Sequence, residues 1–539
     1  MRGWSIVVVM GYFAAPALGQ QSVLDSLHNL SATGPGEIRA AAEQQVCVFC
    51  HTPHRSAAVR PLWNRESSGI PYTVYSSRAL DADPGQPTGA SKMCLSCHDG
   101  SIALGSVLSR DQIIHMAGGI TTLPPASANL GTDLSDDHPV SFRYDAALAV
   151  RDARLVNPRG LAAQIHLDAD GEMQCTSCHD PHDDSFGDFL VMDNRDSSLC
   201  VACHLISKTT VTAHQQCGVC HQSHSAPSGP FLLVEQTVTE TCMSCHDGSM
   251  PRAGDLLADL AKFSVHDTDS PIDPAQGTAH TTCTDCHEPH TMMAGPSAIA
   301  PAMAASMGQP RGAAGTGGRL ESAANEYQVC FRCHGDESVL RASSPVISRQ
   351  IVQTSTRLQF EPSAPSYHPV VAPGRSTNVP SLRPPWTEGS LVLCSDCHGS
   401  NDSRKAGGFG PNGVHGSIYA PILLERYDTL DFTPESSVTY ALCYRCHQRD
   451  GFGGILQDVS FPHKIHVVDA RTPCSTCHTA HGVSSAQGNR INNSHLINFD
   501  TSIVFPDPIT GQLEYRSEGM FSGSCTVTCH GTSHVNQQY

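Results

Sequence analysis

Cysteine and histidine recur together along this chain, in a spacing that could bind a metal or a metal-containing cofactor. Of its 539 residues, 24 are Cys and 30 are His. Eleven segments have the spacing Cys-x-x-Cys-His, and a twelfth, from Cys525 to His530, has one extra residue and reads Cys-Thr-Val-Thr-Cys-His. Numbered 1 to 12 in chain order, these motifs contain all the cysteines: Cys47 and Cys50, Cys94 and Cys97, Cys175 and Cys178, Cys200 and Cys203, Cys217 and Cys220, Cys242 and Cys245, Cys283 and Cys286, Cys330 and Cys333, Cys394 and Cys397, Cys443 and Cys446, Cys474 and Cys477, and Cys525 and Cys529. Their histidines are His51, His98, His179, His204, His221, His246, His287, His334, His398, His447, His478 and His530.

Three kinds of chemistry compete to explain these motifs. Disulfides are common in exported proteins and repeated Cys-x-x-Cys is common in zinc sites, but neither gives a reason for a His after every second Cys. At a frequency of 30 His in 539 residues, twelve such histidines would arise by chance with a probability of about 10⁻¹⁵, whereas c-type haem attachment requires each one. Two thiols on one face of a helical turn can bond the two vinyl groups of a porphyrin, and the next His then points at the iron. The sequence therefore predicts twelve covalently attached haem c groups, with the extra residue of motif 12 distorting its turn.

Further histidines lie at regular positions around the motifs. Motifs 1, 3, 5, 7 and 11 are each followed by another His three residues after the motif histidine, which cannot reach the far face of its own haem but can reach a haem packed alongside. Another His precedes each pair of motifs, and His415 follows motif 9. We therefore predict twelve distal ligands: His28, His54, His138, His182, His214, His224, His266, His290, His368, His415, His466 and His481. The other histidines are spare (His115, His166, His280, His463, His495 and His534), although His280 could replace His266, His463 could replace His466, and His534 could displace any late ligand.

The rest of the composition predicts an irregular fold built around these groups. Gly and Pro are frequent, with 45 and 36 residues, while charged residues make up 16% and aromatic residues only 6% of the chain. We expect a multihaem cytochrome c fold, mostly irregular loop with short helices around a stacked chain of haems, with little β structure. One strand is expected in Val346–Leu358, which is rich in β-branched residues.

The predicted domain organisation follows the motifs. We expect a signal peptide at 1–19, a tetrahaem domain at 20–207, a trihaem region at 208–292, a flexible linker or loop rich in Ala, Gly and Pro at 293–320, and a pentahaem region at 321–539.

The N-terminus has the features of an export signal. Arg2 is followed by an apolar core from Ile6 to Ala15, and Ala17-Leu18-Gly19 offers small residues for cleavage before Gln20. No later apolar run reaches 18 residues, so no transmembrane helix is expected. The formal net charge of −18, with no basic stripe, excludes nucleic acid as a partner.

The density of motifs predicts conduction of electrons. After removal of the signal, about 43 residues remain for each haem, and a compact parcel of that size has a radius of gyration of about 9 Å, so neighbouring haems must nearly touch. Two imidazoles on each iron keep its geometry similar in both oxidation states. Catalysis at haem needs an open axial position, and because every motif ends in His and spare histidines remain, we expect no enzyme.

The N-terminal part of the chain resembles a known family. The segments that carry the resemblance are His28-Asn-Leu-Ser, Gly34-Pro-Gly, Cys47-Val-Phe-Cys-His-Thr-Pro-His54, Pro61-Leu-Trp-Asn-Arg65, Cys94-Leu-Ser-Cys-His-Asp-Gly100, Asp137-His-Pro-Val-Ser-Phe142 and Cys175-Thr-Ser-Cys-His-Asp-Pro-His182. They are similar to the doubled-CXXCH multihaem cytochromes c of metal-reducing bacteria, and residues 22–207 resemble the tetrahaem cytochromes that polymerise into extracellular filaments (nanowires). The resemblance implies bis-His haems stacked in alternating parallel and T-shaped pairs. It also makes His28 a candidate to ligate a haem of the next subunit.

The C-terminal part resembles larger cytochromes of the outer surface and of outer-membrane conduits, through Tyr440-Ala-Leu-Cys-Tyr-Arg-Cys-His447, Phe461-Pro-His-Lys-Ile-His466 and His495-Leu-Ile-Asn-Phe499. Together the resemblances imply an exported dodecahaem carrier for extracellular electron transfer, at the cell surface or outside it, or in the periplasm. Its partners would be other cytochromes or copies of itself, and extracellular electron acceptors. The alternatives are the haem subunit of a porin–cytochrome conduit, with an outer-membrane β-barrel as partner, and a multihaem reductase.

Overall fold

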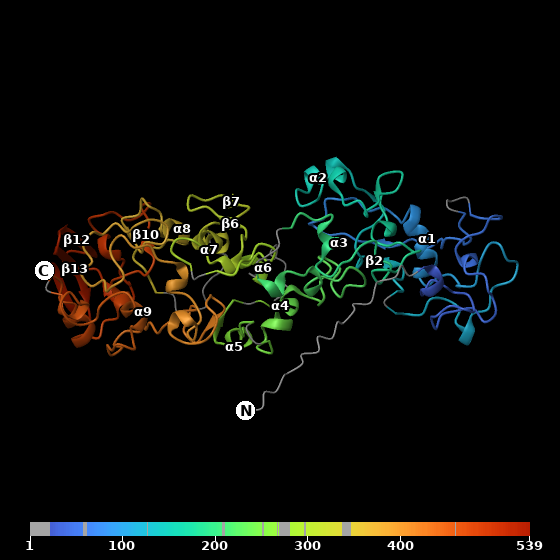
Figure 1. Cartoon of the computed structure of the whole chain (residues 1–539). Helices are drawn as coiled ribbons and strands as arrows, with labels where there is room; N and C mark the ends of the chain where they lie inside the picture. Colours follow the sequence, from blue (N-terminus) through green and yellow to red (C-terminus); the bar gives the residue numbers. More distant parts are fainter. Residues whose placement is uncertain are drawn as a thin grey trace, which may run out of the picture. The chain divides into compact units, whose positions relative to one another are not determined.

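A computed structural model of the chain shows short regular elements joined by long irregular loops (Figure 1). The predicted signal peptide lies outside the described residues. The structure describes residues 22–57, 62–126, 128–206, 211–250, 253–266, 268, 281–295, 298–336, 347–458 and 460–539.

The helices are short because Gly, Pro and turn-forming residues interrupt every apolar stretch. The first, α1, has ten residues, and α2 begins where the Asp145 carboxylate accepts a 2.9 Å hydrogen bond from the Leu148 N–H. The α-helices are α1 Gly89–His98, α2 Ala146–Arg151, α3 Ser198–Val201, α4 Val238–His246, α5 Leu257–Leu260, α6 Cys283–Cys286, α7 Glu326–His334, α8 Thr356–Gln359 and α9 Ala441–Tyr444.

Most of the strands form two-residue pairs that tie loops together. β1 (Thr73–Val74) runs parallel to β2 (Asp133–Leu134), and the other four pairs are antiparallel. They are β3 (Phe142–Arg143) with β4 (Glu172–Met173), β5 (Ser264–Val265) with β9 (Gly416–Ser417), β6 (Gly312–Ala313) with β7 (Arg319–Leu320), and β8 (Ser366–Tyr367) with β10 (Gly482–Val483).

A larger sheet closes the C-terminal end of the chain. Its central strand β13 (Ser522–Cys529) pairs antiparallel with β11 (Val504–Phe505), β12 (Glu514–Gly519) and β14 (Thr532–Gln538). This sheet was not expected, because β13 contains both cysteines of motif 12, and the other motifs favour a helical turn at such a position. The rest of the described chain agrees with the predicted fold class.

The chain divides into two compact units. One comprises Met1–Ser207 with Gln215–Thr237, and the other comprises Lys208–His214 with Val238–Tyr539. The first unit therefore contains motif 5 in addition to the four motifs of the predicted tetrahaem domain. Because the chain passes into the second unit and back before motif 5, a single cut at residue 207 does not separate the units.

The apolar cores are small and lie against the motifs. The described residues form five clusters of buried apolar side chains, and each cluster packs against at least one motif cysteine. In the first unit, for example, Phe49 and Leu104 belong to a cluster that contacts Cys50 and Cys97. This arrangement agrees with an interior that is filled largely by the groups the cysteines carry.

Two local expectations can be compared with the structure. Much of the expected linker, 293–320, is irregular but fixed to motif 7, since the Glu288 N–H donates to the Met307 carbonyl over 2.8 Å. The strand expected in 346–358 is wrong: its described part makes a single bridge, Arg349 with Asp500, and then enters α8. The Arg349 guanidinium donates to the carbonyls of Ser475 and Asn498, so this segment is held by side-chain hydrogen bonds instead of a strand ladder.

No helix in the described part of the chain is both long enough and apolar enough to span a membrane.

Candidate haem-ligating sites

Eleven of the twelve motifs begin on a turn of helix. The N–H of the motif histidine donates to the carbonyl of the first cysteine, over 2.8 Å from His51 to Cys47 and over 3.0 Å from His478 to Cys474. This turn holds both cysteines and the histidine on one compact surface, as thioether attachment requires. The motifs lie in α1, α3, α4, α6, α7 and α9 and in the 3-10 turns Cys47–Phe49, Cys175–Ser177, Cys217–Val219, Cys394–Asp396 and Cys474–Thr476.

The imidazole rings of distant histidines face one another in pairs at nearly constant distance. Ten pairs have ring centroids between 6.1 and 6.4 Å apart. A metal–nitrogen bond of about 2 Å on each side and about 1 Å from each nitrogen to its ring centre give about 6 Å for one metal ion between two imidazoles. The pairs are His51–His182, His28–His98, His179–His224, His138–His204, His214–His246, His287–His415, His266–His334, His398–His481, His463–His478 and His466–His534.

The angles between these rings separate ligation from stacking. The interplanar angle is 15° for His287–His415 and 78° for His138–His204, although the centroid distance is 6.3 Å in both pairs. Ligands on opposite sides of an iron can rotate about the bond to the metal without changing their separation. A fixed distance with a variable angle is therefore what two axial imidazoles produce.

Hydrogen bonds select which nitrogen of each ring is available. In seven motifs the Nδ1–H of the histidine donates to a backbone carbonyl, over 2.7 Å from His98 to Ala128 and 2.8 Å from His179 to Asp188. Several facing histidines do the same, such as His28 with Pro181 over 3.2 Å. Because Nδ1 is occupied, the tautomer is fixed and Nε2 is left to bind metal.

Burial keeps most of these rings neutral, which is the form that binds iron. Burial lowers the pKa of His138 and of His415 to about 4, and it lowers the pKa of His481 to about 3. His224 is an exception, since its hydrogen bond to the Asp137 carboxylate raises its pKa.

A cavity beside motif 10 is lined by basic and acidic side chains. It has a volume of about 560 Å³ and is lined by Tyr444 of the motif and by Arg383 and Arg449. Asp450 also lines the cavity and, with Glu435, pairs with the Arg449 guanidinium, so Arg383 is the lining cation that would complement a haem carboxylate. Haem c therefore fits the donor sets and the surroundings of these motifs.

Comparison with known proteins agrees with this chemistry. The doubled CXXCH motif family matches residues 167–207 and 210–251, which contain motifs 3 to 6. The chain is a multihaem c-type cytochrome. It carries covalently bound haem c and transfers electrons. No curated protein matches its sequence.

Within each unit of this cytochrome, consecutive motifs are neighbours in space. The first cysteines of consecutive motifs lie beside each other in four cases, which are Cys94 with Cys175, Cys200 with Cys217, Cys330 with Cys394, and Cys443 with Cys474. At the alternate steps the second cysteines lie within electrostatic range of each other; these are Cys50 with Cys97, Cys178 with Cys203, Cys286 with Cys333, and Cys397 with Cys446, while Cys477 lies near both cysteines of motif 12.

Backbone contacts support the same order. The Cys175 N–H of motif 3 donates to the Ser91 hydroxyl of α1 over 3.0 Å, and the Cys217 N–H of motif 5 donates to Ser197 Oγ, beside motif 4, over 2.8 Å. The helices α4 and α6, which carry motifs 6 and 7, also pack together. These contacts link motifs 1 to 5 in sequence order in the first unit and motifs 7 to 12 in sequence order in the second, where motif 6 contacts motif 7 through the helices.

The facing histidines interlock the pairs of motifs. His182, which follows motif 3, faces motif 1; His224, which follows motif 5, faces motif 3; and His481, which follows motif 11, faces motif 9. A histidine that precedes a pair faces its second motif, as His28 does with His98. The prediction that a trailing histidine reaches the haem site of another motif thus agrees with the geometry. The motif that it reaches stands two places earlier in the sequence.

Most of the predicted distal histidines lie opposite a motif histidine. Eight of them face the histidine of a motif, and His368 lies near His447, whose pKa is lowered to about 4 by burial and then by this neighbour. His290 bonds Glu288 through Nδ1 over 2.9 Å, and its assignment stays a prediction. The eight are His28, His138, His182, His214, His224, His266, His415 and His481.

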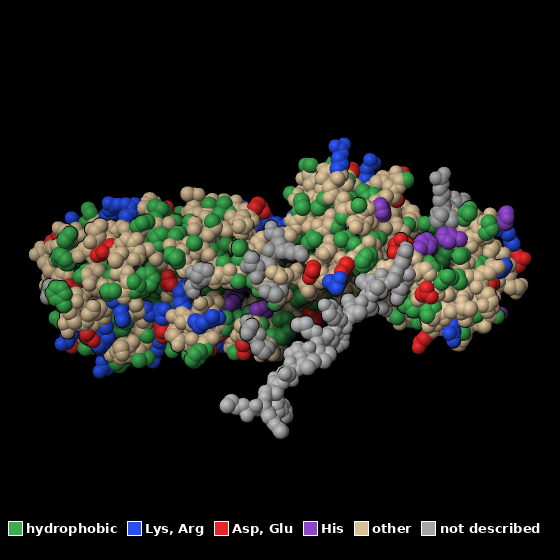
Figure 2. All heavy atoms as spheres, viewed as in Figure 1, with side chains coloured by type: hydrophobic (Ala, Val, Ile, Leu, Met, Phe, Trp, Pro, Cys, Tyr) green, Lys and Arg blue, Asp and Glu red, His purple; other side chains and the backbone are tan. Residues whose placement is uncertain are grey.

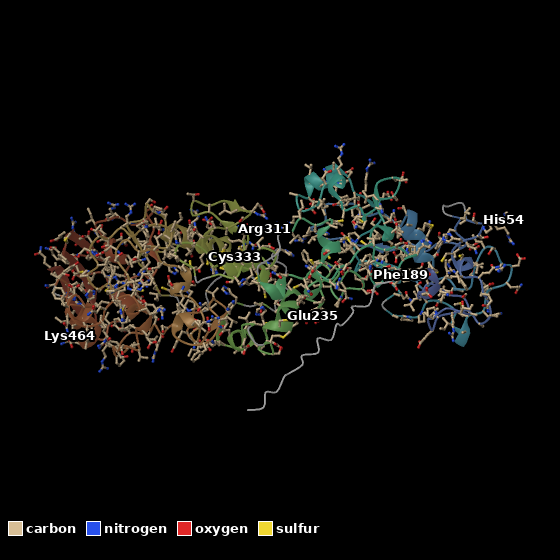
Figure 3. The ribbon with its side chains drawn as sticks, in the orientation of Figure 1. His54, Phe189, Glu235, Arg311, Cys333 and Lys464 are labelled. Atoms are coloured by element: carbon tan, nitrogen blue, oxygen red, sulfur yellow. The ribbon has the colours of Figure 1, made fainter. Side chains whose placement is uncertain are left out.

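Three positions differ from the expectation. His28 faces His98 of its own chain and stacks on Phe189 at 4.1 Å, so it is not a ligand presented to another subunit. His463, predicted as spare, faces His478 at 6.3 Å. His54 is exposed, and its ring faces no other imidazole in the described part of the chain (Figure 3).

The ligands predicted for motif 12 differ most from those that the structure indicates. His530, predicted as its proximal ligand, contacts a carboxylate, whereas His534, predicted as spare, faces His466 at 6.4 Å. The Phe-Pro-His-Lys-Ile-His segment could have predicted two ligands instead of one, since His463 faces His478 and His466 faces His534. The spacing around motif 12 carried no such signal.

Proposed function

We propose that this cytochrome is an exported electron conductor that carries twelve haems, which follow one another in sequence order within each unit. The observation that carries the proposal is the alternation of cysteine contacts, second with second and then first with first, along motifs 1 to 5 of the first unit and motifs 7 to 11 of the second. Haems held by cysteines that lie this close would be near neighbours, and electron tunnelling falls exponentially with distance. Each haem would therefore exchange electrons mainly with the haems before and after it.

The ligand geometry favours conduction over catalysis. A haem held between two imidazoles supplies reversible one-electron chemistry and offers no open axial position to a substrate. The chain's own contribution is to fix many of these imidazoles through Nδ1, as with the 2.8 Å bond from His478 to the His495 carbonyl, so that little movement accompanies oxidation. We therefore propose a carrier and no enzymatic site.

Charge and the N-terminal sequence support an extracellular role. The chain has a formal net charge of −18, to which each haem adds two propionates. This negative charge favours basic proteins or positively charged mineral oxides as electron acceptors. On the face seen in Figure 2, acidic and basic side chains are interspersed.

The proposal is tested by counting haems and spin states in the protein purified from an exporting host. Intact mass and the pyridine haemochrome assay should give twelve haems per chain, and electron paramagnetic resonance of the oxidised protein should show only low-spin iron. Eleven or fewer haems would overturn the count. A high-spin signal that responds to nitrite or sulfite in the unmodified protein would overturn the carrier assignment in favour of a reductase.

One exposed ligand favours assembly into filaments. Every described histidine that trails a motif faces a motif two places earlier, except His290, whose assignment stays a prediction, and His54, because no motif stands two places before motif 1. We propose that His54 is used by a second copy, which would extend the file of haems between subunits.

Electron microscopy of the haem-loaded protein at several concentrations tests this assembly. Filaments with a regular repeat that are lost in His54→Ala, and retained in the equally exposed His115→Ala, are expected. Filaments that persist in His54→Ala would overturn the role of His54. Discrete particles that copurify with an outer-membrane β-barrel would favour the conduit subunit.

A further inference from the structure

Motif 12 lies on a β-hairpin, unlike the other eleven motifs. Cys525 and Cys529 belong to β13, and His530 with Gly531 forms the two-residue turn into β14. Both turn residues have positive φ, +49° at His530 and +76° at Gly531, which fits a type I′ turn. His530 therefore projects from the tip of a hairpin, where a motif histidine elsewhere in the chain continues a helical turn toward the iron.

Contacts hold the His530 ring in an orientation that excludes iron. Its Nε2 lies 3.0 and 2.9 Å from the two carboxylate oxygens of Asp431, and its ring stacks on Phe432 at 4.6 Å with an angle of 19°. In seven other motifs it is Nδ1 that is hydrogen-bonded and Nε2 that is available. The nitrogen that would bind iron is thus already engaged in His530.

His534 occupies the position that His530 leaves. It pairs with Val527 across the hairpin, and because side chains alternate along a strand, it shares a face with Val527 and Cys529. Val527 is buried in the cluster against which both cysteines of the motif pack. The His534 ring faces His466 at 6.4 Å, a distance like that of the nine pairs that involve a motif histidine.

The second member of this pair is fixed as an axial ligand would be. The His466 Nδ1–H donates to the Pro462 carbonyl over 3.1 Å, and its ring stacks on Phe461 at 5.1 Å. Cys477 of motif 11 lies near both Cys525 and Cys529, so this pair sits at the end of the file of motifs.

We infer that the haem of motif 12 is ligated axially by His534 and His466, and that the histidine of the motif itself, His530, is a structural residue held by Asp431 and Phe432. The attachment unit of this haem is then Cys-x-x-x-Cys followed by a ligand five residues later. The inference rests on the proposed function only in requiring that motif 12 carries a haem. It adds a ligand that neither the spacing of the motif nor the family match assigns.

Matched substitutions in the full-length haem-loaded protein test this assignment. His534→Met should retain twelve haems and create one methionine–histidine iron, which is seen as a new sulfur-to-iron charge-transfer band of about one twelfth of the total haem. His534→Ala should convert the same fraction to high-spin iron. His530→Met and His530→Ala, four residues away, should leave every haem low-spin without a sulfur band.

The opposite result would overturn the inference: a sulfur band or a high-spin signal in the His530 variants and neither in the His534 variants. Peptide mass mapping keeps this outcome distinct from a failure of the proposed function. If the unmodified protein carries no haem on Cys525 and Cys529, then the dodecahaem count fails. If haem is present there and only the His530 variants respond, then the count stands and the ligand assignment fails.

Discussion

Asp137→Asn should raise the reduction potential of the haem of motif 3. Asp137 is 4% exposed, and its Oδ1 accepts hydrogen bonds from His224 Nδ1 over 3.0 Å and from the Ser225 N–H over 3.1 Å. His224 in turn faces His179 at 6.1 Å. A buried carboxylate makes the imidazole it accepts from a stronger electron donor, which favours ferric iron. Loss of the negative charge should therefore favour the ferrous state.

The size of the shift follows from the change in hydrogen-bond type. A hydrogen bond to a charged group contributes about 1.5–3 kcal/mol and a neutral one about 1 kcal/mol, so roughly 1 kcal/mol distinguishes the Asp and Asn forms. If this difference acts on the ferric state alone, it corresponds to about 40 mV for one electron, since tenfold in an equilibrium is about 59 mV. The amide NH₂ would replace Oδ2, which has no hydrogen-bond partner in the described structure, and should cost about 1–3 kcal/mol of stability.

Spectroelectrochemical titration is the assay. One twelfth of the absorbance change should move to higher potential in Asp137→Asn, with all haems still low-spin. Asp180→Asn is the matched control, because Asp180 stands at 3.5 Å from His182 Nδ1 and half of its side chain is exposed, so no resolved shift is expected. An unchanged or lowered potential in Asp137→Asn, or an equal shift in the control, would refute the reasoning.

Three further predictions concern stability. The guanidinium of Arg65, which is 1% exposed, donates to three backbone carbonyls, and Arg65→Met should leave them unsatisfied and lower the melting temperature, with a cost of about 3 kcal/mol or more; an unchanged melt would contradict this. Leu424→Ala, at a side chain that is 1% exposed, should cost about 2–5 kcal/mol in denaturant unfolding, whereas the exposed Leu430→Ala should cost little. The hydroxyl of Ser533 lowers the pKa of Asp507 below its ordinary value of 3.8, so the ionised carboxylate stabilises the C-terminal sheet at neutral pH and this stabilisation is lost as the pH falls below about 4. Asp507→Asn should flatten that acid dependence in a thermal melt, and a dependence equal to that of the unmodified protein would contradict the assignment.

The sequence by itself determined the cofactor and how it is attached. Thioether attachment needs two cysteines and a histidine within five residues, so the whole chemical requirement is local and is visible in the eleven regular motifs. The shortage of aromatic residues and the many Gly and Pro residues likewise predicted short helices and long loops. The prediction that trailing histidines serve neighbouring groups followed from the reach of a side chain.

Only the tertiary structure decided which histidine faces which motif and in what order the motifs lie. His182 and His51 are separated by more than a hundred residues, and nothing in their local spacing records that the chain brings them to 6.1 Å. The same holds for His28, which faces His98 of its own chain, and for His463, which faces His478 in place of the predicted His466.

Motif 12 shows the limit of reading a ligand from spacing. One inserted residue is compatible with a distorted helical turn or with a strand, and the choice depends on β11, β12 and β14, which pair with β13. Once the segment is a strand, the side-chain period changes from 3.6 to 2, and the histidine next to the cysteine is carried to the hairpin tip while His534 takes its place. Covalent attachment is a local property of the sequence, whereas axial ligation depends on contacts between segments that are distant in the chain.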